Sequence, residues 1–222
     1  MQRFGLVVAV EEEAVKELYG RPLWQEECAG IPFSMYSRHD KEIIMACTGI
    51  GTIASSAATA ILIEKYQVEA ILNFGVVGAM TNRFSTQAVA FIKEVVDYEY
   101  DVSEIDALPK GMHEGYLGVA LPLDEPLLHK ARERFPDIPV ARLASGNSFL
   151  VGERKIAVNR EFGAELCDME LAGIYFTASR AKIPTFSIKA VSDGIEGDGE
   201  EFYLNKKKAS LLCLKVLDSI LE

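Results

Sequence analysis

The sequence predicts one α/β domain that spans residues 1–222 and is built around a mixed central sheet. Short apolar runs recur along the chain, as expected of strands that are buried on both faces. Segments with helical patterns separate several of these runs. Neither a Pro/Gly/Ser-rich linker nor an internal repeat divides the chain, which is 49% hydrophobic. These three observations together favour a single core.

The elements follow in chain order. Phe4–Val10 is a continuous apolar run that predicts a buried strand, and the three glutamates after it suit the first turn of a helix. Ile31–Arg38 and Glu42–Cys47 lie on either side of Asp40 and predict two strands joined by a turn. The later predicted strands are Ala70–Phe74, Ala88–Val96, Val140–Ala144 and Thr185–Val191. The later predicted helices are Thr52–Tyr66, Leu127–Phe135, Glu170–Arg180 and Phe202–Leu221.

One segment, Asp97–Leu117, shows no clear periodicity and is long for a connection. Loops of this length are often functional, and they are as often ordinary surface excursions. The sequence leaves both interpretations open.

Composition argues against several kinds of partner. The net charge of −10 disfavours nucleic acid and anionic membranes, which need clustered Lys and Arg. No apolar run is long enough to span a bilayer, and Met1–Arg3 leads into a strand rather than a signal peptide, so we expect a cytoplasmic protein. Four scattered cysteines suit reduced thiols. Three histidines that are far apart in the sequence show neither a zinc pattern nor a Ser-His-Asp pattern, and we expect no metal and no cofactor.

Acidic residues follow three of the predicted strands or apolar runs. In open α/β sheets, ligands bind beyond the carboxyl ends of the strands. Glu13, Glu170 and Asp193 all meet that condition. Each also has a structural alternative: a glutamate can serve the helix dipole, Asp168 or Glu170 can start a helix, and Asp193 before a glycine can cap a turn.

Two glycine pairs strengthen the case for a site. "TGIG" (Thr48–Gly51) lies between a strand and a helix, where backbone N–H groups can receive an anion or hydroxyls. "NFGVVGAM" (Asn73–Met80) puts Gly75 and Gly78 at a strand end, where a ligand can approach the backbone. Neither has the spacing of a dinucleotide-binding or P-loop motif, so a Rossmann NAD protein is disfavoured.

Six motifs in this order resemble the nucleoside phosphorylase superfamily: "GLVVAVEEEA", "TGIG", "NFGVVGA", "SGNSFL", "DMELAG" and "KAVSDG". The resemblance spans almost the whole chain and is strongest to the hydrolytic branch, the 5′-methylthioadenosine/S-adenosylhomocysteine nucleosidases. It implies a three-layer α/β/α fold, usually a homodimer, that cleaves the N-glycosidic bond of a purine nucleoside with water. Such an enzyme acts in nucleoside catabolism and methionine salvage.

The resemblance also implies roles for individual residues. Glu13 matches the residue that activates water, and Asp193 matches the acid at N7 of the purine. Glu170 matches the carboxylate that holds the ribose hydroxyls. The remaining matched positions line the sugar, the base, the backbone of the site or the 5′ substituent: Met169, Phe149, Leu150, Ile50, Gly75, Val76, Gly78, Ser192 and Phe202 (or Tyr203). A partner subunit contributes from around Val102 and Ile105 in such dimers.

The chemistry explains why carboxyl groups suffice. Glycosidic cleavage passes through an oxocarbenium-like sugar, which needs an acid at the leaving group and a base or anion at the opposite face. An aspartic acid that burial keeps protonated suits the leaving purine. Successive helical residues turn by about 100°, so all three glutamates cannot face one site. We expect Glu13 to point inward, with Glu11 and Glu12 at the helix start and surface.

Water is favoured over phosphate as the nucleophile. Phosphorylases of the superfamily carry arginines where this chain has Asn73 and Glu11–Glu13, and the glutamates repel phosphate. Three features depart from the nucleosidase pattern: Val76 stands for a serine that holds water, Lys189 replaces an arginine, and the segment 97–115 keeps little of the usual pattern. Futalosine hydrolase, purine nucleoside phosphorylase and a non-catalytic nucleoside-binding protein therefore stay open as alternatives.

Overall fold

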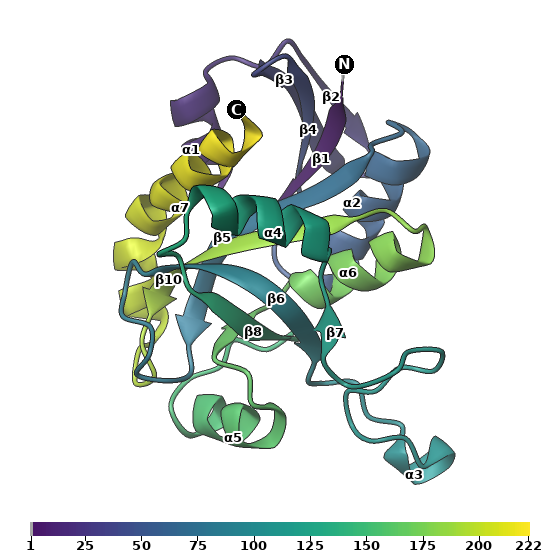
Figure 1. Cartoon of the computed structure of the whole chain (residues 1–222), viewed down its shortest axis with the longest axis vertical. Coiled ribbons are helices and arrows are strands. Elements are labelled where there is room, and N and C mark those ends of the chain that lie inside the picture. The colour runs from purple at the N-terminus through teal and green to yellow at the C-terminus, as the bar shows by residue number, and fades with distance from the viewer. Residues whose placement is uncertain (1) are drawn as a thin grey trace.

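The computed structural model describes residues 2–222 and contains a ten-stranded mixed sheet with helices on both faces (Figure 1). The strands are β1 (Arg3–Val8), β2 (Trp24–Cys28), β3 (Ile31–Arg38), β4 (Lys41–Cys47), β5 (Ala70–Ala79), β6 (Val89–Asp97), β7 (Leu121–Pro122), β8 (Val140–Ser145), β9 (Leu166–Asp168) and β10 (Thr185–Asp193). The helices are α1 (Glu12–Tyr19), α2 (Thr52–Glu64), α3 (Ser103–Asp106), α4 (Glu125–Arg134), α5 (Glu153–Phe162), α6 (Leu171–Arg180) and α7 (Gly199–Leu221).

This architecture confirms the predicted α/β fold with a mixed sheet. Every element that the sequence predicts is present, with ends that differ by a few residues. The short strands β2, β7 and β9 and the helices α3 and α5 were not predicted. All five are either short or rich in charged residues, so they carry little apolar periodicity.

Strand β5 is the centre of the sheet. It pairs in parallel with β1 and with β10, and its end pairs antiparallel with β9. From β10 the sheet continues through β6 and β8 and returns to β9. The strands β5, β10, β6, β8 and β9 therefore form a closed cycle of pairings, and the sheet curls round at the carboxyl end of β5.

Two helical layers cover the sheet (Figure 1). Helices α1, α4 and α7 lie on one face, where their apolar residues pack against side chains of β1, β5 and β10. Helices α2 and α6 pack against each other on the opposite face. Because most apolar residues of β1, β5 and β10 are buried, these strands have the continuous hydrophobic pattern of a sheet covered on both sides.

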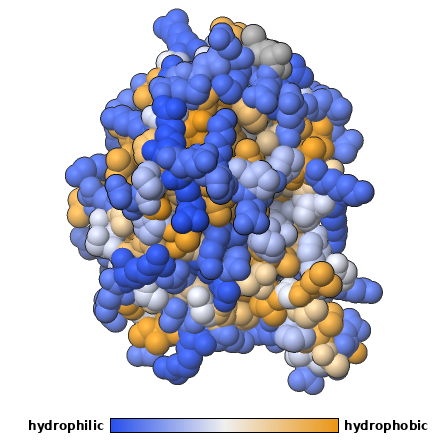
Figure 2. Space-filling view, viewed as in Figure 1, coloured by the Kyte–Doolittle hydropathy of each residue, from blue (hydrophilic) through white to orange (hydrophobic). Residues whose placement is uncertain are grey.

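The segment 97–117 carries α3 away from the body, at the lower right of Figure 1. Apolar atoms gather at the same corner of the surface in Figure 2. Ile105 is 79% exposed, and Leu117 is fully exposed. The base of the segment is held by His113, whose Nε2 lies 2.9 Å from Asp97 Oδ2 and whose ring stacks on Tyr100.

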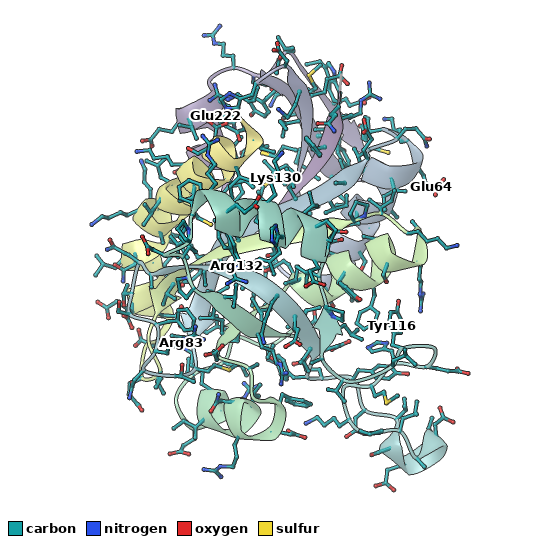
Figure 3. All side chains as sticks on the ribbon, in the orientation of Figure 1. Glu64, Arg83, Tyr116, Lys130, Arg132 and Glu222 are labelled. Atoms are coloured by element: carbon teal, nitrogen blue, oxygen red, sulfur yellow. The ribbon has the colours of Figure 1, made fainter. Side chains whose placement is uncertain are left out.

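The charged side chain of Glu64 lies at the right-hand edge of the fold in Figure 3. Within residues 2–222, no helix is both long and apolar enough to cross a membrane.

Candidate active site

A cleft of about 370 Å³ lies at the carboxyl ends of β1, β5, β9 and β10. Parallel strands end at the same edge of a sheet, so the loops and acids that follow them converge there. Most of the residues predicted for the site line this cleft: Ile50, Val76, Gly78, Phe149, Leu150, Met169, Glu170, Ser192, Asp193 and Phe202. It is also lined by Ala9, Val10, Glu11, Val77, Ser148, Cys167, Asp168, Gly199 and Tyr203.

The glutamate that enters the cleft is Glu11, and the prediction that Glu13 points inward is wrong. Glu13 is exposed, whereas Glu11 is only 5% exposed. The reason is the phase of α1. Its buried residues are Ala14 and Val15, and Glu11 precedes them by three and four positions, which places it on the same face. Glu12 stays at the surface, as predicted, with Oε1 2.8 Å from Lys16 Nζ.

Backbone amides hold the Glu11 carboxylate. Its Oε2 accepts hydrogen bonds from the N–H groups of Ala9 (3.0 Å) and Val10 (2.9 Å). Its Oε1 accepts one from the N–H of Val76 (3.3 Å), in β5. These three donors hold the carboxyl group in a fixed orientation. Val76 thus contacts Glu11 through its backbone, although its side chain lacks a hydroxyl.

The predicted Gly75 does not line the cleft but lies behind this carboxylate. A Cβ at Gly75 would come within 3.0 Å of Glu11 Oε1 and 3.5 Å of Lys189 Nζ. The absence of a side chain there lets Glu11 pack against β5.

Asp193 ends β10 and is 1% exposed. The pairing register of β10 with β5 shifts between Val191 and Asp193, and an irregularity of this kind can re-aim a side chain beside an active site. The Ser192 hydroxyl donates to Asp193 Oδ1 at 2.6 Å. Lys155, which the sequence analysis did not identify, lies in α5 with Nζ 2.5 Å from Asp193 Oδ2. A buried cation therefore faces the Asp193 carboxyl group.

Glu170 precedes α6 and is held beside the "TGIG" turn. Its Oε1 accepts the N–H of Gly51 at 3.0 Å, where a φ of +113° suits glycine. The anion received by this turn is thus a side chain of the protein itself. Burial, together with the nearby negative charge of Asp168, raises the pKa of Glu170 to about 7.

Asp168 forms a second buried ion pair. Its Oδ2 lies 2.8 Å from Lys189 Nζ, and both side chains are at most 2% exposed. Burial by itself lowers the pKa of Lys189, but the carboxyl groups of Asp168 and Glu170 outweigh it and the net shift is upward. Asp168 Oδ1 also accepts the N–H groups of Glu170 and Leu171, so it starts α6 as well as holding the lysine.

Aromatic and aliphatic side chains form the rest of the cleft. The ring of Phe149 meets that of Phe202 edge to face, with centroids 5.8 Å apart. Phe149 is 41% exposed and Ile50 is 59% exposed, so both lie at the open side. Leu150 is buried below them. This wall suits a flat ring and an apolar substituent.

No group of His, Cys, Asp and Glu in residues 2–222 has the arrangement of a metal site. Cys167 lines the cleft, but burial raises the pKa of its thiol to about 12, which keeps it neutral. The acidic side chains that line the cleft are Glu11, Asp168, Glu170 and Asp193.

Several known nucleosidases are similar to this chain in sequence or in structure. An aminodeoxyfutalosine nucleosidase from Campylobacter jejuni is 29% identical over 80% of each chain. A 5′-methylthioadenosine/S-adenosylhomocysteine nucleosidase from Shewanella loihica is 27% identical over 88% of each chain. The crystal structure of such a nucleosidase from Helicobacter pylori, with butyl-thio-DADMe-Immucillin-A, has a TM-score of 0.93 and 26% identity. It covers 100% of this chain and 98% of its own.

A family model described as the phosphorylase superfamily matches residues 3–222. The match takes in every element from β1 to α7 and all the acids of the cleft. The chain therefore belongs to the phosphorylase superfamily.

Proposed function

We propose that this protein is an N-glycosidase that hydrolyses a purine nucleoside, most suitably a 5′-substituted adenosine such as methylthioadenosine or S-adenosylhomocysteine. One observation carries the proposal: two buried carboxyl groups meet the same strand at different points. Glu11 contacts β5 at Gly75 and Val76, and Asp193 contacts it at Gly78. These contact points lie two to three residues apart, or about 7–10 Å along the strand, which leaves room for a glycosidic bond and a water molecule between the two acids.

The proposed roles are consistent with these positions. Glu11, oriented by its three backbone donors, takes a proton from the water that attacks C1′. Asp193 donates a proton to N7 of the departing base, and the Ser192 hydroxyl holds the Asp193 carboxyl group in its orientation. Glu170 binds the ribose hydroxyls, and Met169 packs beside the sugar. General acid–base catalysis by such a pair contributes about two to four powers of ten in rate.

The apolar residues supply binding. Phe149 stacks on the base, and Leu150 lies below it. Ile50, Phe202 and Tyr203, at the open side of the cleft, accept the 5′ substituent. An apolar substituent fits this wall, because it removes exposed hydrocarbon from water.

Charge favours water over phosphate. The residues 2–222 that line the cleft include Glu11, Asp168, Glu170 and Asp193 but no Lys, Arg or His. The two lysines nearest to these acids, Lys155 and Lys189, are already paired with Asp193 and Asp168. A phosphate ion would therefore meet negative charge without a free cation.

An aminodeoxyfutalosine substrate is the second candidate, because a relative of that name is among the most similar proteins and covers 80% of the chain. The cleft is open where the 5′ group would lie, since Ile50 and Tyr203 are 59% and 71% exposed. A bulky 5′ group can extend through that opening.

The test is release of free base. The purified protein is incubated with methylthioadenosine, adenosine, inosine, futalosine and aminodeoxyfutalosine, with and without phosphate. Phosphate-independent release of adenine from methylthioadenosine is expected. Release from aminodeoxyfutalosine alone would select the second candidate, hypoxanthine from futalosine would indicate a futalosine hydrolase, and release only with phosphate would contradict hydrolysis. Nucleoside binding without release would indicate a binding protein.

We also propose a cytoplasmic homodimer in which α3 of one subunit reaches the cleft of the other. Its support is the exposed apolar surface around Val102, Ile105 and Leu117, which projects from the body (Figures 1 and 2). Exposed apolar surface of this kind commonly marks an interface. Light scattering after gel filtration measures the assembly, and Ile105→Glu is expected to yield monomers.

A further inference from the structure

Lys155 is a buried cation behind the cleft. It lies in α5, and its side chain is 0% exposed. The ammonium group lies 2.5 Å from Asp193 Oδ2 and also donates to the backbone carbonyl of Gly194. It does not line the cleft itself. Lys155 therefore contacts a residue of the cleft, Asp193, without lining the cleft itself.

The surrounding backbone makes room for this pair. A Cβ at Gly78 would come within 2.9 Å of Asp193 Oδ2 and 3.1 Å of Lys155 Cε. Burial of an ammonium group is costly, and an apolar side chain of similar length would fill the same space without that cost. A structural role alone gives no reason for the charge.

The other ionisable groups around the pair are already engaged or neutral. Cys167, beside Asp193, stays a thiol because burial raises its pKa to about 12. Asp168 is paired with Lys189. Glu201 accepts the N–H of Gly194 and the hydroxyl of Thr86. Among residues 2–222, the cation in contact with Asp193 is therefore Lys155.

We propose that Lys155 is a positioning residue that holds the proton which Asp193 passes to the departing base. This inference rests on the proposed function. Lys155 and Asp193 share one transferable proton. It can lie on Lys155, as an ammonium beside a carboxylate, or on Asp193, as a carboxylic acid beside a neutral amine. Lys155 thus gives the acid a proton supply that is shielded from solvent.

The step balances. Asp193 gives a proton to N7 of the base and receives one from Lys155 Nζ, so Asp193 ends as it began and Lys155 becomes a neutral amine. The C1′–N9 bond breaks, and its electron pair goes to the base, which leaves neutral. Water forms the new bond to C1′, and its proton goes to Glu11. After the products leave, Glu11 gives its proton to water in the open cleft, and Asp193, which lines the cleft, passes a proton from that water back to Lys155.

The pH dependence of kcat tests this proposal. An ammonium group ordinarily keeps its proton to about six pH units above the point where a carboxylic acid loses its own. For the native protein we expect kcat to hold up to about pH 9. In Lys155→Met, Asp193 must keep the proton alone, so the alkaline limb moves to lower pH. At about pH 9, kcat falls by about a hundredfold or more, while KM changes little and kcat recovers as the pH is lowered.

Two further variants sharpen the result. Lys155→Arg keeps the positive charge, but a guanidinium does not release its proton in proteins, so we expect a low kcat at every pH. Lys130→Met removes an exposed lysine of α4 and serves as the control, with the native profile. Thermal melting and adenine binding verify that each variant is folded.

Several outcomes would overturn the proposal. They are a Lys155→Met variant with the native pH profile, a loss of kcat in it that is equal at all pH values, and a Lys155→Arg variant as active as the native protein. If no Lys155 variant folds, the pH profile of the native protein tests the proposal. A native kcat that declines with rising pH before about pH 7 is that of a lone carboxylic acid and would overturn it. Failure of the native protein to release base would instead overturn the proposed function.

Discussion

The carboxylate of Glu11 accepts a hydrogen bond from the backbone N–H of Val76, 65 residues further along the chain. This contact ties the loop after β1 to the centre of the sheet. It also distinguishes Glu11, which is buried, from Glu13, which is exposed. The two glutamates therefore form a matched pair for experiment.

We expect Glu11→Gln to lower kcat by about two to four powers of ten, because a neutral amide cannot take the proton from water. Glu13→Gln makes the same chemical change at the surface and should leave kcat close to native. Steady-state assays of base release measure both. A large loss in Glu13→Gln with an active Glu11→Gln would reverse the assignment.

Glu170 predicts a pH dependence of stability. Its folded pKa, about 7, lies above the ordinary value of 4.5, so the folded state binds more protons between these two values. The favourable contribution is complete below about pH 4.5 and is lost as the pH rises through about 7. We expect native protein to lose up to about 3 kcal/mol relative to Glu170→Gln across that interval. Urea unfolding at several pH values measures it, and parallel curves for the two proteins would contradict it.

The Asp168–Lys189 pair predicts a large loss of stability when it is broken. Lys189→Met leaves Asp168 buried without its cation, which costs about 3–5 kcal/mol in the free energy of unfolding. Lys93→Met is the control, since Lys93 is 45% exposed and pairs with Glu94 at the surface. That change should cost less than about 1 kcal/mol. Equal losses in the two variants would argue against a buried pair.

Gly78 predicts a steric effect on Asp193. In Gly78→Ala the new methyl group would lie 2.9 Å from Asp193 Oδ2 and 3.0 Å from Cys167 Sγ. Displacement of the carboxyl group by about 1 Å can cost about a hundredfold in rate, so we expect kcat to fall at least about tenfold. Gly118→Ala, where nothing lies within 4 Å of the added Cβ, is the control. A Gly78→Ala variant with native kcat would show that the site tolerates the methyl group.

The sequence predicts the sheet and the location of the site well, for a physical reason. Continuous apolar runs mark buried strands, and acids that follow parallel strands share one edge of the sheet. Asp193 and Glu170 were found in this way. The prediction for Glu13 is wrong because Ala14 and Val15 mark the buried face of α1. Glu11, three and four residues before them, lies on that face, and Glu13 does not.

Other features left no signal in one sequence. Lys155 lies in "ERKIAVNREF", where charged residues on all sides suggest a surface helix rather than a buried cation. Asp168 and Lys189 meet only because β9 and β10 lie next to the same end of β5. Pairings between distant segments depend on the tertiary fold, which a single pattern of residues does not specify.

The central position of β5 has a consequence for how this protein can diverge. Glu11 and Asp193 both contact a strand that has β1, β10 and β9 as neighbours, so the backbone of β5 sets the spacing between these two carboxyl groups. Amides of β5 should exchange with deuterium more slowly than those of segment 97–117. Under the proposed function, side chains at the rim such as Ile50 and Tyr203 can then be replaced to admit a different 5′ group, while the two carboxyl groups keep their separation.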